Sequence, residues 1–426
     1  MRIGLLDWND RIQDLVLTID IYQILHSSAW PLTLLLAWFL GERLFALWRV
    51  PRVTSYFALG LLVGWADWFG MGAATFGLSF LANLALAIVL FELGYRINLR
   101  WFRHNPWVLV LGLFESALTF GAAFWASGWF GLSLEVRLIL AALAVSVSPA
   151  VLVRVAADTR SSGPVTERVM HLCAINCLVA VFLVKLVLGM WHLRASGDWT
   201  AAAFGSIYAL GLSAALGAAA GVAIPWLLRH FAMHSQSVTV VFSLTVLLLT
   251  TLAYGLMLSP ILVALVFGIA ARECRVQLST AQRGFGSIGE LLMVFLFVYV
   301  GTLIHWPDVW TSLAIAAVLL GLRLLTKTLS NLLLAHWSGI SWRKGLWCGL
   351  ALTPMSPFIV LLLEQTRLYG FEPASAAFAA MAALTVLQGL FGPWVAQWSL
   401  VAARETDFTH PARAPAAIAR KDNHGA

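Results

Sequence analysis

The segment Leu143–Val153, LAVSVSPAVLV, places a proline after two serines in the middle of a long apolar run. The run covers 134–156, which is long enough to cross the hydrocarbon core of a bilayer. A proline inside a helix removes a backbone donor and clashes with the carbonyl one turn earlier. Backbone groups freed at that depth must face protein or a water-filled cavity, because lipid offers them no partner. We therefore predict a helix break at Ser146, Ser148 and Pro149 that faces the protein interior.

The whole chain has the composition of a membrane protein. Its 426 residues are 61% hydrophobic and only 11% charged, whereas soluble proteins carry about 25% charged residues. Apolar runs recur from end to end, and they predict an all-α polytopic membrane protein with about 13 transmembrane helices. The predicted spans are 29–48, 53–66, 75–95, 107–127, 134–156, 167–190, 200–228, 236–254, 260–271, 287–304, 309–334, 343–366 and 376–402.

Loop charges orient these spans. The odd-numbered loops carry 19 of the 27 Lys and Arg residues, and the even-numbered loops carry 3. Basic residues accumulate in cytoplasmic loops, so this alternation predicts an outside N-terminus and a cytoplasmic C-terminus in a cell (plasma or inner) membrane. The loops also account for the net charge of +7. No basic patch with interleaved aromatic residues indicates nucleic-acid binding, so the predicted environment is the lipid bilayer.

A second interruption occurs in the twelfth predicted span. The segment Leu352–Val360, LTPMSPFIV, combines two prolines with hydroxyl side chains inside an apolar run. The interruption predicts a second broken helix, whose candidate site residues are Thr353, Pro354, Ser356 and Pro357. Paired interrupted helices in corresponding positions of two halves are the best sequence indication of a transporter's substrate site.

The positions of the two breaks predict an internal repeat. The fifth and twelfth spans are seven apart, so the two broken helices run through the membrane in opposite directions. We therefore expect two inverted six-helix repeats with crossing discontinuous helices around a central polar site. The predicted division is an N-terminal interfacial segment 1–28, a first repeat 29–190, a connector helix 191–235, a second repeat 236–402 and a disordered cytoplasmic tail 403–426.

Ionisable residues inside the predicted spans are candidates for function, because each costs about 2.5–3.5 kcal/mol to insert. Lys327 lies near the centre of the eleventh span, with Arg323 one turn earlier on the same face. Glu115 lies deep in the fourth span, and we expect it either to neutralise Lys327 or to pack as a protonated acid. Glu92 lies near the end of the third span, where an ion pair with Arg96 is the expected role.

The sixth predicted span carries His171, Cys173, Asn176 and Cys177 as its polar residues. Asn176 lies near mid-membrane and is expected to bond to a neighbouring helix, with the first break as its partner. One His and two Cys on one helix without a nearby Asp or Glu form a weak metal pattern, so we predict no metal site. The chain shows no nucleophile–base pair and no phosphate-binding loop, so we expect neither an enzyme nor a bound cofactor.

Several segments resemble one family, the monovalent cation–proton antiporters of the sodium/proton exchanger superfamily. They are VPRVTSYFALGLLVG (50–64), VLFELGYRINLRWFR (89–103), GLMLSPILVALVFGIAARECR (255–275), VFLFVYVGTLI (294–304) and KTLSNLLLAHWSGISWRKGLWCGLAL (327–352). The resemblance places Lys327 on the family's intramembrane cation. It implies inverted repeats, a mobile core domain, a monovalent cation and a proton as transported ions, and a homodimer.

The chain departs from this family at two positions. The family commonly has threonine–aspartate–proline where this chain has Val147, Ser148 and Pro149, and an aspartate where it has Cys177 after Asn176. Exchange needs a group that holds a cation when charged and releases it when protonated, and a buried thiol is a poor substitute at neutral pH.

Three functions remain open at this stage. The first is monovalent cation/H+ exchange by alternating access, with Glu115 or Glu92 replacing the lost carboxylate. The second is transport of an anion or neutral solute, held by Lys327, Asn176, Ser148 and half-helix N-termini. The third is a transport-inactive sensor or partner subunit.

Overall fold

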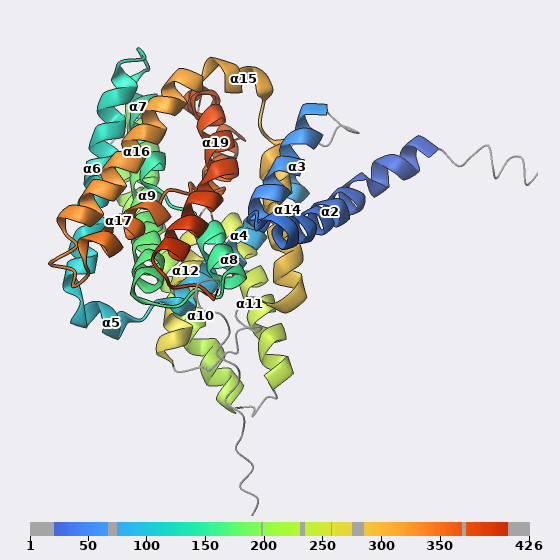
Figure 1. Cartoon of the computed structure of the whole chain (residues 1–426), viewed down its shortest axis with the longest axis horizontal. Coiled ribbons are helices and arrows are strands. Elements are labelled where there is room, and N and C mark those ends of the chain that lie inside the picture. The colour runs from blue at the N-terminus through green and yellow to red at the C-terminus, as the bar shows by residue number, and fades with distance from the viewer. Residues whose placement is uncertain are drawn as a thin grey trace, which may run out of the picture.

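The computed structural model describes residues 21–66, 75–196, 199–230, 235–256, 258–274, 285–368 and 372–407. These residues form helices and turns, and no strand occurs among them. Within this part of the chain, nine helical segments are long and apolar enough to cross a membrane. Figure 1 shows the helices packed in a multi-helix assembly from which α2 (Ile21–Trp48) projects. The molecule is a multi-pass membrane protein, as predicted.

Each predicted span coincides with one helix or, at the two breaks, with a pair of helices. The unbroken spans are α2, α3 (Arg52–Ala66), α4 (Phe76–Arg96), α6 (Pro106–Gly128), α9 (Pro164–Ser196), α10 (Trp199–His230), α11 (Ser235–Gly255), α12 (Pro260–Glu273), α14 (Gly286–Thr302), α16 (Leu313–Leu333) and α19 (Glu372–Ala402). The broken spans are α7 (Leu134–Val145) with α8 (Pro149–Asp158), and α17 (Trp342–Ala351) with α18 (Phe358–Leu368). The short helix α5 (Leu99–His104) was not predicted, and the predicted span 309–334 merged the end of the short helix α15 (Trp306–Thr311) with α16.

Glycines allow close helix packing in one part of the assembly, which we call the glycine-packed bundle (α2, α3, α4, α10, α11, α12 and α14). Helix α3 packs on α14, and α4 packs on α12. A Cβ atom built on Gly60 would lie 2.2 Å from the carbonyl oxygen of Val298, and one on Gly94 would lie 2.2 Å from that of Leu265. Small residues at such crossings let backbones approach closely, which drives helix association in lipid.

The remaining helices, α6 to α9 and α16 to α19, form a second group, which we call the broken-helix bundle. Helix α6 packs on α7 and α16, and α19 packs on α7, α16 and α17. The two bundles meet where α4 contacts α8, where α3 contacts α19 and where α9 contacts α10. The breaks therefore lie in one bundle and face the other across a seam.

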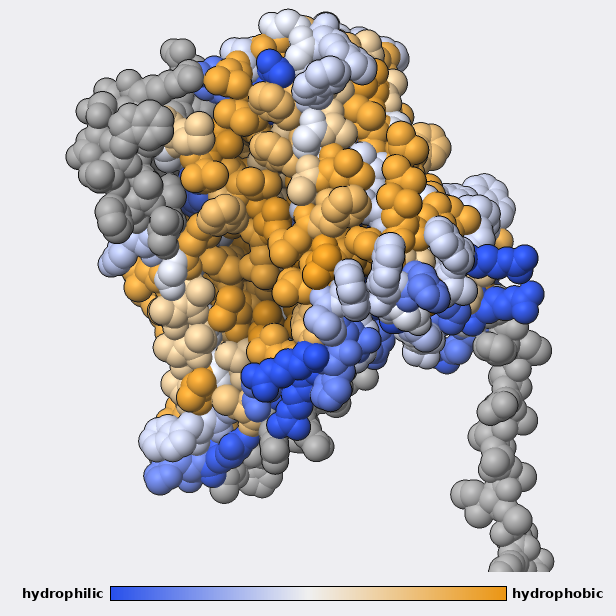
Figure 2. Space-filling model, turned by 90° about the vertical axis from the view of Figure 1, so that its left-hand side faces the viewer, coloured by the Kyte–Doolittle hydropathy of each residue, from blue (hydrophilic) through white to orange (hydrophobic). Residues whose placement is uncertain are grey.

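The outer surface of the broken-helix bundle suits a lipid environment. Figure 2 shows hydrophobic residues over most of this face, with hydrophilic residues gathered toward one end. The exposed side chains include Leu109 and Leu113 of α6 and Leu325 and Leu329 of α16. Large apolar side chains on this scale are exposed in soluble monomers only in isolated patches.

The ends of the chain are partly described. The predicted interfacial segment 1–28 falls mostly outside the described residues, and α2 begins at Ile21. Of the predicted tail, residues 403–407 pack against the start of α9, where the Glu405 carboxylate accepts hydrogen bonds from the backbone amides of Val165 (2.9 Å) and Thr166 (2.8 Å). Residues 408–426 lie outside the described residues.

Candidate transport site

The first break has the form predicted from its serines and proline. Helix α7 ends at Val145, the backbone of Ser146 and Ser148 is extended, and Pro149 is the first residue of α8. The Ser148 hydroxyl caps α8 by accepting a hydrogen bond of 3.2 Å from the amide of Val151. A serine at the N-cap followed by proline at the first helical position is a strong signal for a helix start, so the sequence ends one helix and begins another at mid-membrane.

The second break contacts the first directly. Helix α17 ends at Ala351 and α18 begins at Phe358. The carbonyl of Pro354 accepts a 2.9 Å hydrogen bond from the backbone amide of Ser148. Each break thus satisfies a backbone group of the other, as buried backbone in a membrane requires.

Arg323 of α16 joins the two breaks from one side. Its fully buried guanidinium donates to the carbonyl of Ala144, to that of Ser146 at 3.0 Å and to that of Thr353 at 3.2 Å. These carbonyls lie at the C-terminal ends of α7 and α17, and each helix C-terminus carries a partial charge of about −0.5. The single positive charge of Arg323 therefore offsets the two helix ends.

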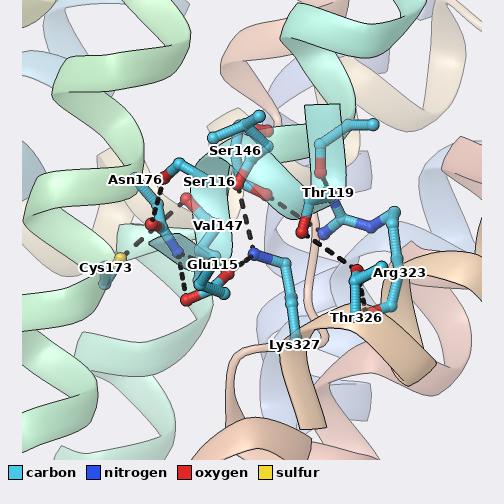
Figure 3. Close-up of polar contacts among 12 residues, drawn as sticks. Glu115, Ser116, Thr119, Ser146, Val147, Cys173, Asn176, Arg323, Thr326 and Lys327 are labelled. Atoms are coloured by element: carbon cyan, nitrogen blue, oxygen red, sulfur yellow. Dashed lines mark hydrogen bonds and ion pairs between the residues drawn. The ribbon is translucent and has the colours of Figure 1, made fainter. Parts of the chain in front are cut away.

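Lys327, one turn further along α16, forms an ion pair with Glu115 of α6 (Figure 3). Its ammonium donates to Glu115 Oε1 and, at 3.2 Å, to the carbonyl of Val145 at the end of α7. Both side chains are 0% exposed. Because Arg323 offsets the helix ends, Glu115 and Lys327 form a locally balanced pair.

Asn176 of α9 is a second hydrogen-bond partner of the Glu115 carboxylate. Its Nδ2 donates to Glu115 Oε1 at 3.1 Å and to Oε2 at 3.2 Å, and its Oδ1 accepts a 3.0 Å hydrogen bond from the Ser116 hydroxyl. The expectation that Asn176 bonds to the first break was wrong, because its amide bonds to Glu115 and Ser116 of α6 instead. Glu115 is therefore fixed between an amide and an ammonium (Figure 3).

The two cysteines of α9 contact the backbone of the first break. The thiols of Cys177 and Cys173 both point to the carbonyl of Val147, at 3.2 Å and 3.9 Å. They satisfy one of the carbonyls exposed by the break, and both are buried. The position where the family commonly has an aspartate is thus a donor to the broken backbone.

Other predicted site residues lie away from this cluster. His171 stacks on Trp101, with ring centroids 4.4 Å apart, and its Nδ1 lies 2.7 Å from the carbonyl of Glu167. Glu92 pairs with Arg96 at 2.7 Å, as expected for a helix end. Ser356 and Pro357 line a small cavity on the side of the second break that faces the glycine-packed bundle.

Sequence reasoning missed several polar groups of the cluster. Ser116 bonds to Asn176, and the hydroxyls of Thr119 and Thr326 lie 3.0 Å apart, one on α6 and one on α16. Their signal was present, since Thr119 follows Glu115 by one helical turn, Ser116 is the residue next to Glu115, and Thr326 precedes Lys327. The carbonyls of Val145 and Val147 carried no sequence signal, because any residue supplies one.

Comparison with known proteins agrees with the geometry. A family model described as "Sodium/hydrogen exchanger, transmembrane" matches residues 32–398. The chain is similar to the ammonium/H(+) antiporter subunit AmhT of Alkalihalophilus pseudofirmus, at 24% identity over 86% of this chain and 92% of that protein.

The fold is also similar to solved structures of the sodium proton antiporter MjNhaP1 from Methanocaldococcus jannaschii. One, at pH 8, has a TM-score of 0.66 at 16% identity, covering 90% of this chain and 97% of that chain. Another has a TM-score of 0.70 at 17% identity, covering 89% and 96%. The predicted sodium/proton antiporter-like fold is confirmed. The family match covers nearly the whole chain, and the chain therefore belongs to the sodium/hydrogen exchanger family of membrane transporters.

Proposed function

We propose that the chain exchanges a monovalent cation for protons and that Glu115 is the carboxylate that binds them in turn. The observation that carries this proposal is the buried Glu115–Lys327 pair beside the crossing of the two broken helices. A carboxylate can bind a cation when charged and release it when protonated, which is the property that exchange requires. Glu115 thus supplies from α6 the acid that the chain lacks at Ser148 and Cys177.

In this proposal the Lys327 ammonium competes with the transported cation for the same oxygen ligands. Its ammonium occupies two acceptors, Glu115 Oε1 and the Val145 carbonyl, that an incoming cation would use. A bound cation and the charged lysine repel each other at this distance in a medium of low dielectric constant. Cation binding therefore requires Lys327 to leave Glu115, and protonation of the Glu115 carboxylate then releases the cation.

The groups around the pair favour ammonium among the monovalent cations. Lys327 shows that a substituted ammonium is accepted there by one carboxylate oxygen and one carbonyl oxygen. The relative from Alkalihalophilus pseudofirmus is named as an ammonium/H(+) antiporter subunit. A free ammonium ion presents the same N–H donors as the lysine side chain, and we propose it as the preferred cargo.

The alternatives are less well supported. An anion or neutral solute was considered because carboxylates are missing from the usual positions, and Glu115 supplies one at the centre of the cluster. The same carboxylate argues against a transport-inactive protein. Glu92 is not favoured as carrier, because it lies at the end of α4, where it pairs with Arg96 and not with Lys327 beside the breaks.

We further propose the predicted setting: a homodimer in the cell (plasma or inner) membrane, with the N-terminus outside and the C-terminus in the cytoplasm. Arg52 at the start of α3 and Arg154 of α8 share the carboxylate of Asp158, and Arg272 of α12 donates to the carbonyls of Tyr95 and Arg96. These contacts support placing the basic loops at one end. The two breaks occupy corresponding positions of the proposed repeats 29–190 and 236–402, around the connector 191–235.

The test is cation-dependent proton flux in proteoliposomes that contain a trapped pH dye. With an imposed proton gradient, sodium, potassium or rubidium is expected to dissipate the gradient, and Glu115→Gln to abolish this response. Ammonium is scored by competition against radiolabelled rubidium uptake, because uncharged ammonia crosses bilayers by itself. Glu92→Gln is the matched control and should retain exchange. A proton flux that no monovalent cation changes, or full exchange by Glu115→Gln, would contradict the proposal.

A further inference from the structure

Gln388 of α19 is a buried amide that the transport cluster does not use. It is 2% exposed, and neither its Oε1 nor its Nε2 has a hydrogen-bond partner among the described residues. Buried side-chain amides nearly always have partners, since an unpaired one loses its hydration without compensation. Gln388 therefore indicates a polar ligand.

The space for such a ligand lies beside the amide. Gln388 lines a small cavity of about 20 Å³ together with Phe57, Val151, Phe297, Met355 and Ser356. A single water molecule needs about 10–15 Å³ of such space and two to four polar partners. The cavity is therefore the size of one water molecule.

The cavity lies on the seam between the two bundles. Phe57 and Phe297 come from α3 and α14 of the glycine-packed bundle, whereas Val151, Ser356 and Gln388 come from α8, the second break and α19. The bundles touch tightly here, since a Cβ atom on Gly389 would lie 2.3 Å from the Phe57 ring. The outer face of the broken-helix bundle is apolar (Figure 2), whereas its seam side carries the polar groups of Ser356 and Gln388.

The chemistry of the cavity favours water over a bare ion. An amide offers both a donor and an acceptor, and water can use both, whereas a bare metal cation can use only the acceptor. The described lining residues include no carboxylate, and the lining residues Val151, Ser356 and Pro357 lie at the N-terminal ends of α8 and α18. These ends carry positive partial charge and disfavour a dehydrated cation.

We infer that Gln388 binds one ordered water molecule in this seam cavity and that the hydrated amide is a step on the cation's route to the breaks. The water donates to Oε1 and accepts from Nε2, and Phe57, Phe297 and Met355 close the cavity around it. The second part of the inference rests on the proposed function, because it assigns Gln388 to the path that leads to Glu115.

Radiolytic hydroxyl-radical labelling of the full chain in proteoliposomes tests the water. Radicals form from water next to the reacting side chain, so Met355 is expected to be labelled several-fold more than Met170, although their exposures are similar at 7% and 5%. Gln388→Leu should reduce Met355 labelling to the level of Met170. Gln397→Leu, which changes another buried glutamine of α19 that donates to the carbonyl of Arg49, should leave it unchanged. Equal labelling of the two methionines in the unmodified protein would overturn the water site.

Transport measurements test the route. Gln388→Leu is expected to raise the KM for the cation several-fold with a smaller change in maximal rate, whereas Gln397→Leu leaves KM unchanged. If Gln388→Leu does not fold, Gln388→Met is used instead, because methionine keeps the length of the glutamine side chain. In that variant the labelled residue that is followed is Phe297, which also lines the cavity, in place of Met355. An unchanged KM with lost labelling would overturn the route and keep the water. Full exchange by Glu115→Gln would overturn the proposed function and leave the labelling result intact.

Discussion

The backbone amide of Ser148 donates a 2.9 Å hydrogen bond to the carbonyl of Pro354, so the first helix break is completed by the second. Arg323 reinforces the junction by donating to carbonyls on both sides of it. Each break would be costly alone, because its backbone groups would be unpaired inside the membrane. Together they form a single polar unit, and the Glu115–Lys327 pair lies against one end of it through the carbonyl of Val145.

Glu115→Gln is predicted to lower the free energy of unfolding as well as to stop exchange. Removing one partner of a buried ion pair costs about 3–5 kcal/mol, because it leaves the other charge unpaired. The measurement is thermal unfolding of the purified protein in detergent, in parallel with Glu92→Gln.

The double variant Glu115→Gln/Lys327→Met separates these two effects. It removes both charges, and replacing a buried ion pair by uncharged residues is often neutral or stabilising. We expect it to recover most of the thermal stability but none of the exchange. Recovery of exchange in this variant would show that neither charge carries the transported ion.

Cys177→Ser is predicted to preserve transport, and Cys177→Asp to impair it. The thiol donates to the carbonyl of Val147, and a serine hydroxyl keeps that donor. A charged aspartate would instead face the carbonyl with a second acceptor, which is unfavourable unless a proton or a cation lies between them. The Asp variant should therefore unfold at lower temperature and be stabilised by added cation, which a titration of melting temperature against cation concentration will show. Equal stability of the Ser and Asp variants without cation would contradict this account.

The sequence predicted the helices and both breaks because their signals are local. Span length and the prolines at 149, 354 and 357 are read from short windows, and each predicted span or break matched a helix or a break. Lys327 was found in the same way, from the cost of one charge in one span.

The partners within the site were harder to predict. Asn176 and Glu115 are 61 positions apart, and so are far from each other in sequence. Lys327 and Glu115 are 212 apart; their pairing was one of two alternatives left open by the sequence, and the structure shows it. Their pairing depends on how α6, α9 and α16 rotate about their axes, and each of these helices is apolar on several sides. Asn176 was assigned to the break because polar groups were known there, whereas the competing hydroxyl of Ser116 and the carboxylate of Glu115 were closer.

Arg323→Lys is predicted to destabilise the protein although it keeps the charge. The guanidinium donates to carbonyls of Ala144, Ser146 and Thr353. A lysine ammonium is a compact point charge on a flexible stem and does not reproduce this spread of donors. Each hydrogen bond lost from a charged group costs about 1.5–3 kcal/mol. The thermal unfolding temperature should fall, and Arg103→Lys, a change at an exposed position of α5, should leave it unchanged.

Asp158→Asn is predicted to weaken the contact between the two bundles. The Asp158 carboxylate pairs with Arg52 of α3 and, at 3.0 Å, with Arg154 of α8, and Arg154 also pairs with Glu290 of α14 at 2.9 Å. Because the bonds of Asp158 are charge-assisted and largely buried, we expect a loss of about 1.5–3 kcal/mol in the free energy of unfolding. The matched control is Asp308→Asn, whose pair with His305 is largely exposed; surface pairs contribute about 0–1 kcal/mol. Equal unfolding temperatures for the two variants would contradict the assigned role.

Gly60→Ala is predicted to destabilise the glycine-packed bundle, whereas Gly121→Ala is not. The added methyl group at Gly60 would lie 2.2 Å from the carbonyl oxygen of Val298, and α14 presents backbone there rather than a side chain that can move aside. Overpacking of this kind costs about 1–3 kcal/mol. Nothing lies within 4 Å of a Cβ atom on Gly121, and alanine is favoured over glycine by up to about 1 kcal/mol inside a helix. The thermal unfolding temperature should fall in Gly60→Ala and should not fall in Gly121→Ala. An equal loss of stability in the two variants would show that the close approach of α3 and α14 is not the reason for a glycine at position 60.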